Sequence, residues 1–395
     1  MSIYSFRARS IFRQEDAAIN TIKVLKRSLA NLPGWRTARK IVVFVSDDWG
    51  SIRTPSNEAL ENLRQQNVDV DKCHYMLFDR LESGDDLEML FGLLEGFADK
   101  NGKSPALTAN CLVANPDFDR IRQSDFSEYH SESVIDTYAE VQGCENNMTI
   151  WEQAIERRVC LPQSHGREHL NVARWMASLQ KNERIARAAF DHRMFGVSSH
   201  TTVPQRLSTM AAFDCDESGE GGNYPEIISE ALDTFRDIYG YASRSFIAPN
   251  YVWDETVERA AKERGVDYIQ SGPVQIIPGH RSDNRRLRRH FQGQRNRLGQ
   301  RYLVRNVQFE PSSDSRKDWV GQALLEMEIA FRFRKPAVIS MHRVNLMGAL
   351  SPENRDRGLM SLKALLSEMV KRWPDLEFLD AVELGDAMPG DGRSL

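Results

Sequence analysis

Two short stretches of the chain combine residue types that metal and proton-transfer chemistry require. Asp47 and Asp48 stand side by side at the end of an apolar run at 41–45, and His165 and His169 stand four residues apart in "PQSHGREH". Adjacent carboxylates repel each other. A helix cap, the structural alternative, needs only one of them, whereas a cation or a shared proton makes both useful. A spacing of four places two imidazoles on one face of a helical turn, and two histidines with one carboxylate suit Zn²⁺ or another first-row divalent cation.

The elements that must position these residues alternate along the chain. Short β-branched runs and longer stretches of helical period follow one another, which indicates a mostly parallel sheet with crossover helices. A (β/α) barrel is the economical interpretation, and an open doubly wound sheet is the alternative. We expect strands at 41–46, within 105–114, ending at 162, and at 243–248, 266–270, 302–307, 337–341 and 376–381. We expect helices at 17–32, 84–102, from 149 onward, and at 226–239, 254–264, 319–332 and 352–371.

Polar residues also follow two later strands. Pro249, Asn250 and Tyr251 come after the strand at 243–248, and His342 comes after the strand at 337–341. Because barrel chemistry collects at the carboxyl ends of the strands, we expect these residues to lie on one face with the two aspartates and the two histidines.

The same stretches, in the same order, resemble the motifs of polysaccharide deacetylases of the NodB-homology type, carbohydrate esterase family 4. "VFVSDDWG" resembles the family's first motif, a strand that runs into Asp-Asp-Gly, and "HGREH" resembles its second, His-(Ser/Thr)-x-x-His. "FIAPNY" resembles the third motif, Arg-Pro-Pro-Tyr, and "VISMHR" resembles the last, a strand that ends in His. The resemblance covers about 40–386 and implies a distorted (β/α)7 barrel, here with long loop insertions.

Carried onto this sequence, the resemblance implies that Asp48, His165 and His169 hold a divalent metal. Zn²⁺ is the first expectation, with Co²⁺, Ni²⁺ or Mn²⁺ as alternatives. It also implies Asp47 as the general base and His342 as the general acid. The residues that we expect to contact the substrate are Trp49, Pro249, Asn250, Tyr251 and Arg305. Among these the aromatic rings could stack on a sugar, although core packing is the commoner use of such rings.

The sequence departs from the family pattern at three points. Trp49 is interposed before Gly50, Ile247 stands where the third motif has its Arg, and His165 follows Asp48 by 117 residues. Because that Arg orients the base in the family, either another Arg substitutes for it here or the activity is altered. The long insertions imply a substrate unlike plain chitin.

These expectations define one leading function and two alternatives. The leading function is a metal-dependent hydrolase that removes an acetyl group, N-acetyl foremost, from an amino sugar of a polysaccharide or glycan precursor. The first alternative keeps the metal and the barrel but cleaves a C–N bond in a small molecule. The second is a catalytically silent barrel that binds sugar and has lost turnover together with the missing Arg.

Composition excludes several other classes of protein. The formal net charge is −4 and the chain is 41% hydrophobic, so no global nucleic-acid signature exists. Five scattered cysteines without a C-x-x-C spacing argue against a disulfide framework or a zinc ribbon. The first residues lack an apolar core and no run approaches the roughly 20 apolar residues that span a bilayer, so we expect no transmembrane segment and a cytoplasmic location.

Three further segments complete the expected organisation. We expect a helical extension at 1–39 packed on the barrel, the barrel at 40–386 and a tail at 387–395. The arginine-rich stretch at 281–301 is either a solvated surface loop or a basic rim for an anionic or diphosphate-linked sugar. His200 is equally well explained as a pocket residue or as a loop histidine.

Overall fold

The computed structural model describes residues 28, 31–197, 208–215, 223–279 and 286–389. The expected helix at 17–32 lies almost entirely outside these residues, as do His200, positions 281–285 of the arginine-rich stretch and most of the tail. The described end of the expected extension contacts the barrel, since the Nζ of the buried Lys335 donates to the carbonyl oxygens of Pro33, Gly34 and Trp35 at 2.8, 2.6 and 2.7 Å.

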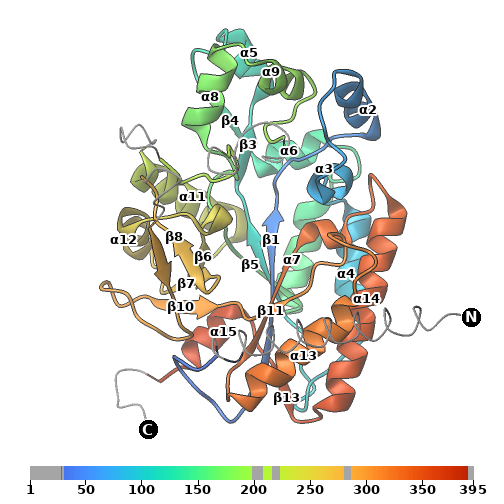
Figure 1. Ribbon diagram of the computed structural model, residues 1–395, viewed down its shortest axis with the longest axis vertical. Coiled ribbons are helices and arrows are strands. Elements are labelled where there is room, and N and C mark those ends of the chain that lie inside the picture. The colour runs from blue at the N-terminus through green and yellow to red at the C-terminus, as the bar shows by residue number, and fades with distance from the viewer. Residues whose placement is uncertain (1–27, 29–30, 198–207, 216–222, 280–285, 390–395) are drawn as a thin grey trace, which may run out of the picture.

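Strand β1 (Lys40–Trp49) is the centre of the molecule, and nine of its ten residues are buried (Figure 1). Successive side chains of a strand point to opposite faces, and here both faces are apolar. Val42 and Phe44 pack against the outer helices, whereas Ile41, Val43 and Val45 point to the opposite face and pack in the interior that the curled sheet encloses. The apolar run that the sequence shows is therefore a strand buried on both sides.

The parallel sheet curls around β1 and forms a ring. Its order is β10, β7, β6, β5, β2, β1, β12 and β11, and β13 pairs with the start of β1. These strands are β2 (Leu107–Cys111), β5 (Cys160–Ser164), β6 (Ser245–Ile247), β7 (Tyr268–Ser271), β10 (Arg301–Val304), β11 (Val307–Gln308), β12 (Ala337–His342) and β13 (Leu376–Phe378).

One continuous segment, 301–308, closes this ring. Its first half, β10, pairs with β7, and its second half, β11, pairs with β12 on the far side of the sheet. The sequence predicts a single strand here, and the structure breaks that strand at Arg305 and Asn306. Counted as one member, the segment joins β1, β2, β5, β6, β7 and β12 in a ring of seven, which confirms the distorted (β/α)7 barrel.

Helices cover the outside of the ring. They are α4 (Gly84–Glu95), α7 (Asn147–Glu156), α11 (Tyr224–Tyr239), α12 (Glu255–Glu263), α13 (Trp319–Arg332) and α14 (Pro352–Arg372), and α15 (Ala381–Asp386) lies at the amino end of the strands. The predicted helices in these regions are confirmed, although the one expected at 84–102 already ends at Glu95. Among the described residues, we find no helix with the length and apolar character needed to cross a membrane.

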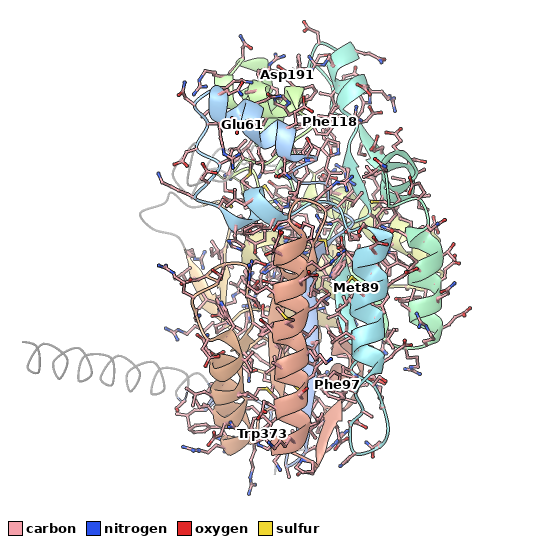
Figure 2. The ribbon with its side chains drawn as sticks, turned by 90° about the vertical axis from the view of Figure 1, so that its right-hand side faces the viewer. Glu61, Met89, Phe97, Phe118, Asp191 and Trp373 are labelled. Atoms are coloured by element: carbon pink, nitrogen blue, oxygen red, sulfur yellow. The ribbon has the colours of Figure 1, made fainter. Side chains whose placement is uncertain are left out.

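Additional elements cover the carboxyl end of the ring. They are α2 (Asn57–Gln65), α3 (His74–Phe78), β3 (Ala114–Pro116), α5 (Phe118–Gln123), β4 (Ser131–Ser133), α6 (Val134–Glu140), α8 (Val172–Gln180) and α9 (Arg184–Asp191). Figure 2 shows Glu61, Phe118 and Asp191 of this cap at the end of the molecule opposite Trp373. Most of the cap comes from the long insertions between the first two motifs, whereas α8 and α9 follow the second motif, and together they cover the strand ends where the predicted site lies.

Candidate metal and proton-transfer site

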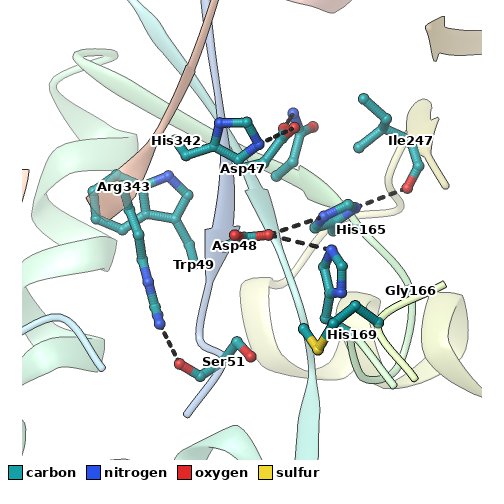
Figure 3. A network of polar contacts seen from close by, with 12 residues as sticks. Asp47, Asp48, Trp49, Ser51, His165, Gly166, His169, Ile247, His342 and Arg343 are labelled. Atoms are coloured by element: carbon teal, nitrogen blue, oxygen red, sulfur yellow. Dashed lines mark hydrogen bonds and ion pairs between the residues drawn. The ribbon is translucent and has the colours of Figure 1, made fainter. Parts of the chain in front are cut away.

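A strained backbone at the end of β1 orients Asp48, the first candidate metal ligand. The pairing of β1 with β2 shifts register between Ser46 and Trp49, and Asp48 within that irregularity has a φ of +77°. A positive φ is unfavourable for a residue with a side chain, and such strain persists only where the surroundings hold it. Both carboxylates consequently reach the same pocket, Asp47 beside His342 and Asp48 beside the other two histidines (Figure 3).

His165 and His169 lie in a loop, so the helical turn expected from their spacing is wrong. Gly166 has a φ of +104° directly after His165, and the next helix, α8, begins only at Val172. The loop nevertheless brings the two rings to a centroid distance of 5.2 Å. The Nε2 atoms of His165 and His169 lie 3.4 and 3.6 Å from Oδ1 of Asp48.

These three side chains fit a divalent cation. Nδ1 of His165 lies 2.9 Å from the carbonyl oxygen of Ile247, which can only accept, so Nδ1 carries the proton and Nε2 presents a lone pair. Oδ1 of Asp48 is buried and finds no hydrogen-bond partner within the described ranges. One ligand atom from each of the three residues lies within 4.8 Å of the others. Buried lone pairs that converge in this way suit a cation placed between them.

The second oxygen of Asp48 is held from outside the trio. Nη2 of Arg53 donates to Oδ2 of Asp48 at 3.1 Å, and the side chains of both residues are nearly buried. Asp48 can therefore offer Oδ1 alone to a cation while Arg53 fixes the carboxylate plane. Partners of this kind tune metal affinity almost as strongly as the ligands themselves.

The two residues predicted to be catalytic, Asp47 and His342, lie next to each other beside the candidate ligands. Nε2 of His342 lies 3.8 Å from Oδ2 of Asp47. Nδ1 of His342 lies 2.6 Å from Oε1 of Glu310. Burial alone would lower the pKa of His342, but the negative charge of Glu310 and its hydrogen bond raise that pKa to about 10, so the ring is charged at neutral pH.

Arg305 supplies the guanidinium that the third motif lacks. Its Nη1 and Nη2 donate to Oδ2 and Oδ1 of Asp47, both at 2.6 Å, and Asn110 donates to Oδ1 at 2.7 Å. Burial would raise the pKa of Asp47, but Arg305 lowers it to about 2, which keeps the carboxylate ionised. Ile247 contributes only the backbone carbonyl that orients His165. Arg305 is thus the candidate for the other Arg that the sequence analysis expects, and it lies at the break between β10 and β11.

The residues expected to contact substrate are placed unevenly. Trp49 is fully buried, packs edge-on against Trp151 and donates its indole N–H to Ser46, so no ring face is left for a sugar and we do not retain it as a substrate contact. Arg305 is 5% exposed and is committed to Asp47, which makes it a positioning residue. Asn250 has a φ of +55° and lines the pocket, whereas Pro249 is buried.

Tyr251, Arg53, Asn110 and Glu310 complete the surroundings of the site. Nη1 of Arg305 donates to the hydroxyl oxygen of Tyr251 at 3.4 Å. Sequence reasoning missed Arg53, Asn110 and the pairing of Glu310 with His342. The position of Glu310 soon after the strand at 302–307 indicates weakly that it lies near the site. Its position along the chain does not show which histidine it contacts.

A cavity of about 250 Å³ opens onto this site. Its walls combine Asp48, His169 and His342 from the barrel with His74 and Tyr75 from α3. The Tyr75 ring meets the His342 ring edge-on at a centroid distance of 5.5 Å. Cap and barrel therefore share one pocket, and its volume suits a single sugar unit or a molecule of similar size.

Comparison with known proteins gives likenesses in architecture. No protein-family model matches the sequence, and no curated protein matches it significantly. A 4-alpha-glucanotransferase from Thermococcus litoralis is similar over 89% of this chain, with a TM-score of 0.44 and 8% identity, and this chain spans only 41% of its length. A family 4 carbohydrate esterase from Streptomyces lividans, in complex with acetate, has a TM-score of 0.33 and 9% identity over 86% of this chain and 91% of its own.

A third structure bears a different description. A CE4 family pseudoenzyme from Bacillus anthracis has a TM-score of 0.36 and 8% identity over 88% of this chain and 66% of its own. The descriptions thus include enzymes and a pseudoenzyme at comparable levels of likeness. Activity has to be argued from the geometry of the site itself.

Proposed function

We propose that the protein is a metal-dependent hydrolase that removes an acetyl group, N-acetyl foremost, from an amino sugar of a glycan or glycan precursor. One observation carries the proposal. Three converging lone pairs, from Asp48, His165 and His169, lie beside an Asp47–His342 pair whose members have separate charged partners. A hydrolase of this kind needs a cation site, a base and an acid in one pocket, and this pocket offers all three.

The chain's own residues divide the proton transfers between them. Asp47 accepts a proton from the attacking water, and Arg305 holds both of its oxygens so that the carboxylate stays ionised and oriented. His342 donates its Nε2 proton to the nitrogen that leaves as the carbon–nitrogen bond breaks, and Glu310 holds the opposite ring nitrogen. The products are acetate and the free amine. A cation bound to Asp48, His165 and His169, with Zn²⁺ as the first expectation, supplies a Lewis acid that polarises the acetyl carbonyl and makes water more acidic.

Two further points support the proposal. The order of the motifs along the chain resembles that of the polysaccharide deacetylases, and the contact of Arg305 with Asp47 supports an active site over a silent barrel. Cys73, Cys111, Cys144 and Cys160 are free thiols, which fits the expected reducing, cytoplasmic compartment. The small volume of the cavity also fits one alternative function, a hydrolase of C–N bonds in small molecules.

The decisive experiment is an acetate-release screen on protein loaded with Zn²⁺ or Co²⁺. The substrates are N-acetylglucosamine, its short oligomers, a nucleotide-linked acetylated sugar and a small cyclic amide. We expect acetate from at least one acetylated sugar and none after treatment with a chelator. Metal and sugar binding without acetate release would support the sugar-binding barrel, and turnover of the cyclic amide alone would support the small-molecule hydrolase.

A further inference from the structure

A buried chain of alternating charges leads away from the candidate metal ligand. Asp48 accepts from Arg53 at 3.1 Å, and Nε of Arg53 lies 3.4 Å from Oδ2 of Asp79. Asp79 accepts from Nε of Arg343 at 3.0 Å, and Nη1 of Arg343 donates to Glu82 at 2.5 Å. The side chains of Asp79, Glu82 and Arg343 are fully buried.

The same network grips the backbone that follows Asp48. Nη2 of Arg343 donates to the carbonyl oxygen of Ser51, as Figure 3 shows, and Glu82 accepts from the N–H of Gly50 at 2.9 Å. Gly50 has a φ of +79°, and a Cβ there would lie 2.6 Å from the carbonyl oxygen of Leu112. The residues directly after the strained Asp48 are thus fixed on both sides by charged side chains.

Core packing does not explain this arrangement. Taking charges out of water is costly, and well-packed apolar residues of similar volume often stabilise a protein equally well or better. The charged side chains add directional hydrogen bonds, because the planar guanidinium of an arginine fixes several partners at once. Arg343 also directly follows His342 in the chain. Its guanidinium therefore fixes the loop after β1, next to Asp48, relative to the end of β12 that carries His342.

We propose that Arg343 is a positioning residue which, through Asp79 and Glu82, holds the loop after β1 so that Asp48 presents a single oxygen to the cation. The inference rests on the metal site of the proposed function. It extends that site from three ligands to a buried network that reaches the residue after His342.

Arg343→Lys tests the proposal, since it keeps the charge but loses the three-way fork. We expect the affinity of the metal-free protein for Zn²⁺, measured by competition with a chromophoric chelator, to fall about 10–100-fold. The matched control is Arg355→Lys, because Arg355 of helix α14 pairs with the buried Asp86 of helix α4 at 3.0 Å and neither residue is a member of the network. We expect the control to lose thermal stability but to keep its Zn²⁺ affinity within about twofold of the wild type.

Asp79→Asn provides an independent measurement if Arg343→Lys fails to fold. We expect it to weaken Zn²⁺ binding as well, and to add little when combined with Arg53→Lys, because both changes break the same chain of contacts. Wild-type affinity in both Arg343→Lys and Asp79→Asn would overturn the inference and leave the proposed function standing. A wild-type protein that binds no divalent cation would overturn both.

Discussion

The cation half of the site and the proton-transfer half share one pocket, but the structure satisfies them in different ways. In the cation half, Oδ1 of Asp48 has no hydrogen-bond donor among the described residues and faces two imidazole nitrogens. In the proton-transfer half, Asp47 has Arg305 and His342 has Glu310, each at 2.6 Å. The first half leaves converging ligand atoms that the described residues do not satisfy, whereas the groups of the second half are paired within the chain.

This difference separates two kinds of measurable effect. Changes in the cation half alter occupancy and the stability that occupancy brings, because a ligand that binds only the folded protein stabilises it. Changes in the proton-transfer half alter turnover while leaving occupancy intact. The five predictions below test the site on this basis, from the largest expected effect to the smallest.

His165→Ala removes one of the three converging lone pairs and strikes the cation half. We expect the variant to purify without stoichiometric metal and to release no acetate above background. At 100 times its dissociation constant, Zn²⁺ adds about 2.7 kcal/mol to the free energy of unfolding of the wild type, and we expect no such gain in the variant. Metal analysis and urea unfolding with and without Zn²⁺ measure this. Full Zn²⁺ stoichiometry in the variant would refute the ligand assignment.

Asp47→Asn changes the proton-transfer half of the site. The amide keeps the shape of the side chain but cannot accept the proton, so we expect kcat to fall about 10²–10⁴-fold with metal content unchanged. Loss of its charge leaves the buried Arg305 unpaired, which also lowers stability. Asp86→Asn is the matched control, because it likewise breaks a buried arginine pair, with Arg355, outside the site. Equal losses of kcat in both variants would show that Asp47 acts only through the fold.

Glu310→Gln sharpens the description of the acid. The Glu310 carboxylate helps to raise the pKa of His342 to about 10, and the two aspartates contribute as well, a share that a bound cation offsets. Activity requires the protonated ring, so it is present below this pKa and lost above it. We expect the alkaline limb of the pH–rate profile to move about 1–3 units lower in the variant. An alkaline limb that stays in place would assign it to another group.

The same ionisation contributes to stability in a defined pH window. Because the pKa of His342 is higher in the folded chain than its ordinary 6.5, the stabilisation is complete below about pH 6.5 and is lost as the pH rises through 10. Urea midpoints measured across this range should fall more steeply for the wild type than for Glu310→Gln.

Neutralising the arginine-rich surface should have the smallest effect. Arg286, Arg288 and Arg289 lie exposed at and beside β9 (Leu287–Arg289), which pairs with β8 (Val274–Ile276), and none of the three lines the cavity. We expect the triple change to glutamine to leave KM and its salt dependence within about twofold, as for a solvated surface. A rise in KM for anionic sugars alone would restore the basic-rim hypothesis.

The sequence predicts the frame of the molecule because local patterns determine it. The strand at 41–46 and the helices at 226–239 and 319–332 all appear, and the four motif stretches meet at one end of the ring. What the sequence cannot supply is pairing in space. Arg305 and Asp47 form an ion pair although they are 258 positions apart in the chain. Glu310 pairs with His342 beyond a strand break that the periodicity of the sequence does not predict.

Two errors have the same physical origin. A spacing of four is helical only if the backbone between is helical, and Gly166 takes the chain out of that conformation. Trp49 looks accessible from its place at a strand end, but helix α7 packs Trp151 against its ring. Tertiary packing decided both positions after local preference had suggested otherwise.

The ring-closing segment 301–308 has a consequence for how the protein is made. His165, His169 and Asp48 belong to the first 169 residues, whereas Arg305, Glu310 and His342 emerge from the ribosome much later. Until 301–308 and 337–342 are available, β1 and β7 each lack a partner, and unpaired strand edges of this kind invite association between chains. The three candidate ligands are therefore synthesised before the residues that hold Asp47 and His342 in place, and these contacts form only when the last strands close the barrel.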